Sequence, residues 1–223
     1  SPKNILLALL SVAAIAWGGL RIATSGDPMA DPLGQSVDAH EKAGKVLAKQ
    51  IAKDLEKTGS LLLLAPPPPP EGLGLDNPQT WMARQTQGFL AGLPNSITVH
   101  TVPVSVAQTR DAQMTGASAE LQWKNIRKAL EKHPKVSAIV SLVGCPKIPK
   151  TAELPPLYVL SRSGDQVHDN MTAGYISFAI VPCNSAQDFD SLRGDWFSVF
   201  YETVTPDTVA AWHQAGKGSP PSK

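Results

Sequence analysis

The spacing of apolar and polar positions divides most of the chain into helical and strand-like segments. A helical repeat begins at Val37, where Ala43, Leu47, Ile51 and Leu55 recur at four-residue intervals between charged residues. This spacing places one apolar stripe along a helix that buries a single face. We therefore expect a helix from residue 37 to about residue 55.

Short, continuous apolar or β-branched runs alternate with further helical patterns. Such runs are typical of strands that are covered on both faces. The segment 196–204 is aromatic and β-branched, which fits a sixth strand or a late helix, and Pro103 suggests that its strand lies at a sheet edge. We expect strands at 60–65, 97–104, 137–143, 157–160 and 175–181, and helices at 80–93, 118–133 and 205–213.

This order of elements predicts an α/β fold. Alternating strands and helices favour a doubly wound, mostly parallel sheet of five or six strands with helices on both faces. The domain is expected to span residues 37–215, and the Gly- and Pro-containing residues 216–223 are expected to form a flexible tail.

An apolar run precedes this domain. Residues 5–20 carry no charge, and with Ile22 and Ala23 the run approaches the roughly 20 residues that cross a bilayer. We expect one transmembrane signal anchor over residues 1–23 and a linker over 24–36; a cleavable signal peptide is the alternative. The anchor residues are Ile5, Leu6, Leu7, Leu9, Leu10, Val12, Ile15, Trp17 and Leu20.

The charges that flank the run indicate an orientation. Lys3 lies on its N-terminal side, whereas Arg21 is followed by Asp27 and Asp31 on the other side. The positive-inside rule then places the N-terminus in the cytoplasm. We expect a single-pass protein of the bacterial inner membrane, in contact with lipid through this helix, with its soluble domain in the periplasm.

The net charge and the cysteine content exclude several classes of partner and cofactor. The formal net charge of +1 gives no reason to expect a nucleic-acid partner. Cys145 and Cys183 are the only cysteines, and their spacing matches no structural zinc site, iron–sulfur cluster or haem attachment motif. We expect no metal and no cofactor. Outside the cytoplasm the two cysteines could form a disulfide; two small buried thiols are the alternative.

The loop after the first strand excludes one large class of ligand. Open α/β sheets bind ligands beyond the carboxyl ends of their strands, and phosphates need backbone N–H groups there. Proline has no N–H, so a phosphate-binding loop cannot be built here. An extended proline run is either a rigid spacer or a docking surface for a partner. The loop consists of Pro66, Pro67, Pro68, Pro69 and Pro70.

A small polar group follows the fourth expected strand. Arg162, Asp165 and His168 lie close in sequence and could form a ligand-binding site; a hydrophilic surface turn is the alternative. No G-x-S-x-G or H-E-x-x-H motif occurs in the chain. No catalytic residues can be assembled, and we expect a protein that is not an enzyme.

Several short motifs resemble the second lobe of type I periplasmic sugar-binding proteins. The helix start at Ala43, Gly44 and Lys45 is followed by Gly88 and Phe89 in the next helix. The His-Pro-x-Val-x-Ala sequence at 133–138 and the segment 171–179 follow in the same order as in that family. The resemblance covers residues 38–184 and implies a single, degenerate lobe of that fold.

The sugar-contacting residues that the resemblance implies are replaced in this chain. The place of the family's Asn-Asp reads 143–146 (Val-Gly-Cys-Pro), and the place of its aspartate holds Ser161 and Arg162. Residues 181–183 stand where the family has a glutamine, and its ligand arginine falls at Ala83, beside Arg84. We therefore expect the fold to carry over without the sugar chemistry.

These features together predict a non-catalytic accessory or scaffolding subunit. The membrane anchor would hold the domain against partner subunits of a membrane complex, of a respiratory or photosynthetic kind for example. The alternative is a membrane-tethered solute-binding or sensor domain for a small ligand.

Overall fold

The computed structural model describes residues 32–74, 77–104, 123–145, 148–149, 152–161, 164, 166–183 and 196–215. The predicted anchor at residues 1–23, the predicted tail and most of the predicted linker lie outside these residues. Within the described ranges, no helix combines the length and the apolar character that a membrane crossing requires.

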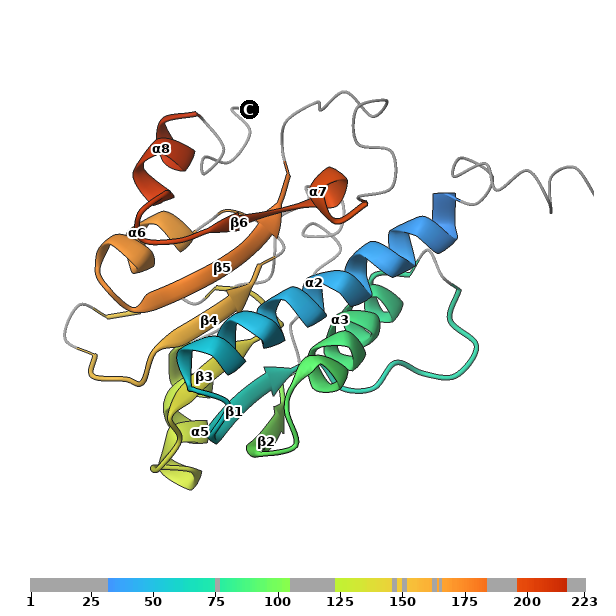
Figure 1. The fold of residues 1–223 in the computed structure, drawn as a ribbon. Helices are drawn as coiled ribbons and strands as arrows, with labels where there is room; N and C mark the ends of the chain where they lie inside the picture. Colours follow the sequence, from blue (N-terminus) through green and yellow to red (C-terminus); the bar gives the residue numbers. More distant parts are fainter. Residues whose placement is uncertain are drawn as a thin grey trace, which may run out of the picture.

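A six-stranded sheet forms the centre of the domain (Figure 1). Its strand order is β2-β1-β3-β4-β5-β6. The first five strands are parallel, and β6 pairs antiparallel with β5. The prediction of a mostly parallel sheet with the proline-ended strand at one edge is confirmed. The strands are β1 (Gly59–Ala65), β2 (Ile97–Pro103), β3 (Ala138–Ser141), β4 (Leu157–Leu160), β5 (Ile176–Pro182) and β6 (Tyr201–Val204).

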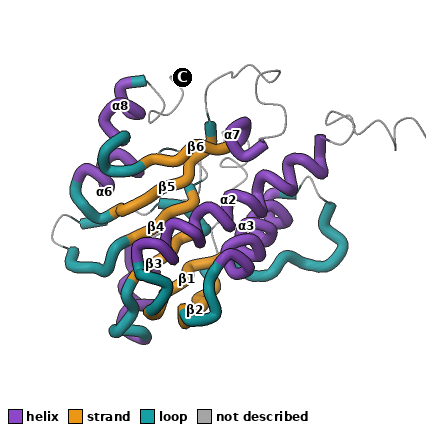
Figure 2. Tube along the Cα trace, viewed as in Figure 1, coloured by secondary structure: helices purple, strands orange, loops and turns teal. Residues whose placement is uncertain are grey.

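Helices cover both faces of this sheet (Figure 2). Buried residues of α2 and α3 pack on one face, beside α7, and those of α5, α6 and α8 pack on the other. The predicted doubly wound arrangement is thus observed. The helices are α2 (Pro32–Asp54), α3 (Pro78–Gly92), α5 (Trp123–Lys132), α6 (Val167–Thr172), α7 (Trp196–Phe200) and α8 (Val209–Gln214).

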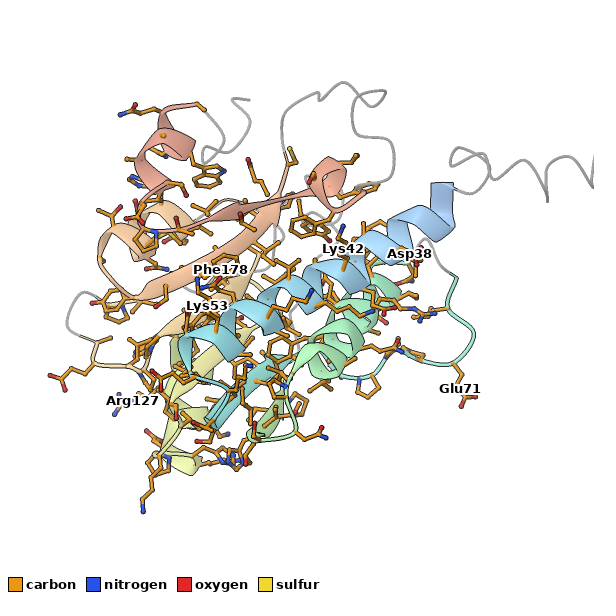
Figure 3. All side chains as sticks on the ribbon, viewed as in Figure 1. Asp38, Lys42, Lys53, Glu71, Arg127 and Phe178 are labelled. Carbon is orange, nitrogen blue, oxygen red and sulfur yellow. The ribbon has the colours of Figure 1, made fainter. Side chains whose placement is uncertain are left out.

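The strand sequences explain why two apolar layers form. Leu61 and Leu63 of β1 pack under α2, while Leu62 and Leu64 face the opposite layer, because successive side chains of a strand point to opposite faces. All four are fully buried. The outer side of α2 carries charged, exposed residues such as Lys53 (Figure 3).

Two glycines allow α2 and α3 to pack backbone against backbone. A Cβ atom on Gly44 would overlap the carbonyl oxygen of Gln85 and lie 2.6 Å from the backbone nitrogen of Phe89. A Cβ atom on Gly88 would overlap the carbonyl oxygen of Glu41. Only glycine permits so close an approach. The Gly44 and Gly88 pair of the family resemblance is therefore the crossing point of these helices.

Several element boundaries differ from the sequence-based expectation; the last helix, for example, begins at Val209 and not at residue 205. Helix α2 begins at Pro32, ahead of the expected start at Val37, because proline is tolerated in the first helical turn, where its missing N–H has no partner. The segment 196–204 is neither one strand nor one helix, since α7 ends at Phe200 and β6 starts at Tyr201.

Candidate functional site

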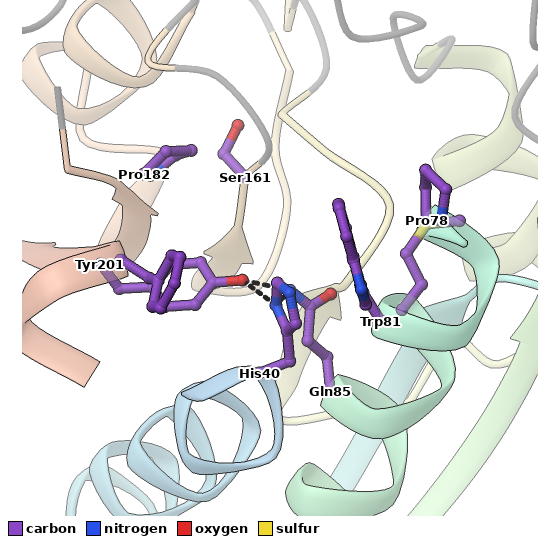
Figure 4. A pocket seen from close by; sticks show the side chains of 9 residues that line it. His40, Pro78, Trp81, Gln85, Ser161, Pro182 and Tyr201 are labelled. Atoms are coloured by element: carbon purple, nitrogen blue, oxygen red, sulfur yellow. Dashed lines mark hydrogen bonds between the residues drawn. The ribbon is translucent and has the colours of Figure 1, made fainter. Parts of the chain in front are cut away.

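A pocket with a volume of about 220 Å³ opens at the carboxyl edge of the sheet (Figure 4). Ser161 directly follows β4 and Pro182 ends β5, so two parallel strands point into it. Helices α2, α3 and α7 supply most of the remaining wall, together with the first residue of β6. The lining residues are His40, Pro78, Trp81, Met82, Gln85, Ser161, Pro182, Phe200 and Tyr201.

Three buried polar side chains meet at the floor of this pocket. Gln85 Nε2 donates a hydrogen bond of 2.9 Å to the hydroxyl oxygen of Tyr201, and His40 Nδ1 forms a short hydrogen bond with the same hydroxyl. Gln85 Nε2 also lies 3.5 Å from His40 Nδ1. Gln85 is 4% exposed. The network therefore joins α2, α3 and β6, three elements that are far apart in the sequence.

The donors and acceptors present fix the direction of one hydrogen bond, from Gln85 to Tyr201, and the direction of the other depends on the tautomer of His40. Because the Tyr201 oxygen accepts from Gln85, its own proton is available to His40. Nδ1 of a neutral imidazole accepts that proton when the ring carries its hydrogen on Nε2. This assignment rests on the network, in which each side chain orients the next.

One polar atom of the network has no partner among the described residues. Gln85 Oε1 is buried and accepts no hydrogen bond. Most buried side-chain polar atoms in folded proteins have a partner. Figure 4 shows this oxygen on the side of the amide that is turned away from Tyr201.

Aromatic rings flank the polar network. The indole of Trp81 stacks on the imidazole of His40, with 5.0 Å between ring centroids and 20° between planes. Phe200 lies 6.5 Å from His40 between centroids and is 37% exposed, at the rim. Pockets that combine apolar walls with a few convergent polar groups are typical of small-molecule sites.

The polar group expected after β4 is only partly described. Arg162 and Asp165 lie outside the described residues. His168 belongs to α6, where its ring stacks on His213 of α8 at 3.9 Å between centroids and its Nδ1 lies 3.1 Å from Asp169. His168 does not line the pocket, so a ligand site at Arg162, Asp165 and His168 stays a prediction.

The proline loop follows β1 at the same edge of the sheet. Pro67, Pro68 and Pro70 are exposed, whereas Pro66 and Pro69 are partly buried. The loop has no regular helix or strand structure. Nothing in the described chain tests a docking role for Pro66 to Pro70, which remains a prediction.

Both cysteines are thiols in the structure. Cys145 is buried, and its Sγ accepts a hydrogen bond of 3.2 Å from Asn170 Nδ2. Burial raises the pKa of the Cys145 thiol to about 12, although the Asn170 bond acts in the opposite direction. Cys183 is only partly buried, so the alternative of two buried thiols fits Cys145 alone, and a disulfide between the two residues stays a prediction. Cys145 is a poor nucleophile in this structure.

Sequence reasoning missed His40, Gln85 and Tyr201. His40 lies on the buried stripe of α2, one turn before Gly44, and Gln85 lies on the buried stripe of α3 between Met82 and Phe89. Polar residues at buried positions of an amphipathic helix are uncommon and often have a specific partner. That signal was present, but it does not identify the partner, because Tyr201 comes from the far end of the chain.

Comparison with known proteins identifies the fold. No protein-family model matches the sequence, and no curated protein matches it either. Solved structures do match. The sugar-binding protein of a sugar ABC transporter from Bacillus halodurans is 15% identical, with a TM-score of 0.50 over 78% of this chain and 64% of that one.

Two further structures are similar. An ABC transporter solute-binding protein from Agrobacterium vitis, bound to α-D-tagatopyranose, is 13% identical, with a TM-score of 0.50 over 80% of this chain and 60% of that one. One from Burkholderia graminis, in complex with D-arabinose, is 16% identical, with a TM-score of 0.49 over 77% and 61%. The chain thus spans about three fifths of the length of these proteins. Over the matched part, its fold is similar to that of the Bacillus halodurans and Agrobacterium vitis proteins.

Proposed function

We propose that this chain is an extracytoplasmic solute-binding domain that holds a small polar solute in the pocket between α2, α3 and β6. The observation that carries the proposal is the buried network of His40, Gln85 and Tyr201 beneath aromatic rings. It lies at the carboxyl edge of an open parallel sheet, where such folds bind their ligands.

The size and lining of the pocket support a small ligand. Its volume of about 220 Å³ falls below the roughly 300–1,000 Å³ of sites for drug-sized molecules. The Bacillus halodurans neighbour is named a sugar-binding protein, and the Agrobacterium vitis neighbour holds a monosaccharide. Monosaccharides are therefore the first solutes to test, although the residues that hold the solute here differ from those that the family resemblance implies.

This proposal corresponds to the alternative drawn from the sequence. The interpretation as an accessory or scaffolding subunit gains no support from the fold, whose neighbours bind solutes. A non-catalytic role agrees with these neighbours at the level of fold. The predicted anchor at residues 1–23 would keep the binding domain at the membrane surface, and other membrane-protein subunits remain proposed partners.

A thermal-shift screen of the full chain in mild detergent tests the proposal. A solute present at 100 times its Kd stabilises the folded protein by about 2.7 kcal/mol, which raises the midpoint of unfolding. Trp81→Ala should abolish the shift because it removes one wall of the pocket. Leu90→Ala is the matched control, since Leu90 is exposed on the same helix and does not line the pocket. If no small solute raises the midpoint, the proposal fails.

A further inference from the structure

The amide of Gln85 is held in one orientation by its neighbours. Its nitrogen is engaged by Tyr201, with His40 within 3.5 Å of the same atom. Turning the amide by 180° would place the carbonyl oxygen of Gln85 against the Tyr201 oxygen and would remove the hydrogen bond that Nε2 donates to it. The network thus fixes the carbonyl end of the side chain on the side away from Tyr201.

The carbonyl oxygen of Gln85 is the one polar atom of this amide that has no hydrogen-bond partner among the described residues. Gln85 lines the pocket, is nine-tenths or more buried, and keeps Oε1 without a hydrogen bond among the described residues. Leaving a buried acceptor unpaired lowers stability, so such an atom in a pocket points to a ligand that pairs with it. An amide oxygen only accepts hydrogen bonds, and the partner must therefore carry an O–H or N–H group.

The absence of charged side chains from the described lining also favours a neutral solute. The nine lining residues of the described chain include no Asp, Glu, Lys or Arg. An anion placed next to Oε1 would meet a partial negative charge with no cation among these residues to offset its lost hydration. Carboxylates, phosphates and sulfates are accordingly disfavoured at this position.

From these contacts we infer that Gln85 is the specificity-determining residue of the pocket. The bound solute is neutral and donates a hydrogen bond to Gln85 Oε1, while an apolar part of it packs on Trp81 and Phe200. This inference rests on the proposed function and adds the chemical class of the solute. Figure 4 shows the buried Oε1 on the side of the amide that faces Trp81.

The test screens the full chain in mild detergent against two matched sets of probes. One set contains neutral donors, namely monosaccharides, polyols and primary amides. The other contains their anionic counterparts, namely aldonates, sugar phosphates and small carboxylates. Dissociation constants from isothermal titration should favour the neutral set by at least tenfold within each matched pair, because the added negative charge of each anionic probe finds no cation among the nine lining residues.

A pair of variants assigns the effect to Gln85. Gln85→Met has nearly the same shape but no amide, and it should weaken binding of the best neutral probe by at least tenfold. Gln87→Met makes the same substitution on the exposed side of α3 and should leave binding unchanged. If Gln85→Met does not fold, the carbonyl ¹³C resonance of Gln85 in the native protein gives the answer, since it should shift when the probe binds.

The outcomes separate this inference from the proposed function. Preferential binding of anions would overturn the inference and imply a reversed amide with its NH₂ toward the solute, while the solute-binding function would stand. Neutral probes that bind equally well to Gln85→Met, and that leave the Gln85 carbonyl ¹³C resonance of the native protein unmoved, would also overturn the inference alone. If neither set binds the folded protein, both proposals are overturned.

Discussion

Tyr201 connects the two other polar residues of the pocket. Its hydroxyl is the common partner of His40 Nδ1 and Gln85 Nε2, and its ring is buried against α2 and Phe197. One oxygen atom therefore satisfies two buried polar groups at once. Removing the partner of a buried polar group destabilises a protein by more than the hydrogen bond had stabilised it.

Tyr201→Phe should consequently destabilise the protein although the ring is retained. We expect a loss of about 1–3 kcal/mol in the free energy of unfolding, because two buried polar groups lose a partner. Urea unfolding followed by circular dichroism measures it. Tyr175→Phe is the control, since the Tyr175 hydroxyl donates to the backbone oxygen of Pro149 at a more exposed position. A change of less than about 0.5 kcal/mol is expected there.

The ionisation of Cys145 responds to its burial. Its pKa is raised to about 12 from 9.0, so the folded protein keeps the proton over a pH range in which the unfolded chain releases it. Between pH 9 and pH 12 the unfolded state binds fewer protons, and stability falls as the pH rises. The slope that one such group contributes reaches about 1.4 kcal/mol per pH unit.

The variant Cys145→Ala should flatten this dependence. Unfolding in urea at pH 8, 9 and 10, with a reductant present, should show a smaller loss of stability with pH than in the unmodified protein. Equal slopes for both proteins would contradict the assignment. In the unmodified protein at pH 8, after the reductant is removed, iodoacetamide should label Cys145 only in the unfolded state, whereas partly buried Cys183 is labelled faster.

At the scale of elements, the crossing of α2 and α3 positions the site. His40 lies one turn before Gly44, and Gln85 lies just before Gly88, so the approach at the glycines brings both polar side chains together. Wider helix spacing would separate them. The close packing thus serves the site as well as the core.

Gly44→Ala should therefore disrupt both stability and binding. Overpacking of a core costs about 1–3 kcal/mol, and here the new methyl group meets backbone atoms that cannot rotate away. Gly92→Ala provides a graded comparison at the end of α3, because its nearest neighbour would be the side-chain Cβ of Ala48 at 2.9 Å. Thermal denaturation should rank Gly44→Ala well below Gly92→Ala. The reverse order would contradict the close approach.

The elements themselves were largely predictable, whereas the site was not. Continuous runs such as 60–65 and alternating segments such as 97–104 carry their strand signal locally. The segment 196–204 mixes helix and strand because pairing of Tyr201 with Pro182 of β5 fixes its second half. The pocket depends on contacts between positions 40, 85 and 201, and no local pattern encodes contacts at that separation.

At the scale of the whole molecule, the location of the domain depends on the apolar N-terminal run. The described residues contain no membrane-spanning helix, and the predicted anchor lies outside them. Its test is therefore biochemical. An uncleaved anchor keeps the full chain in the membrane fraction, and a soluble binding protein would be released.

Leu10→Arg tests the anchor directly. An arginine at the centre of a spanning helix costs about 2.5–3.5 kcal/mol on the insertion scale, so we expect a larger share of the chain in the supernatant after alkaline carbonate extraction. Leu10→Phe keeps the position apolar and should sediment with the membranes like the unmodified chain. Full release of the unmodified chain by carbonate would contradict the anchor.

The antiparallel strand β6 is the last strand of the sheet to leave the ribosome during synthesis of the chain. A ribosome that has released residues up to Cys183 has already delivered the five parallel strands and most of both apolar layers, but Tyr201 is still missing. His40 and Gln85 then lack the hydroxyl that orients them. A nascent chain can thus acquire most of its core before the polar network that lines the pocket is complete.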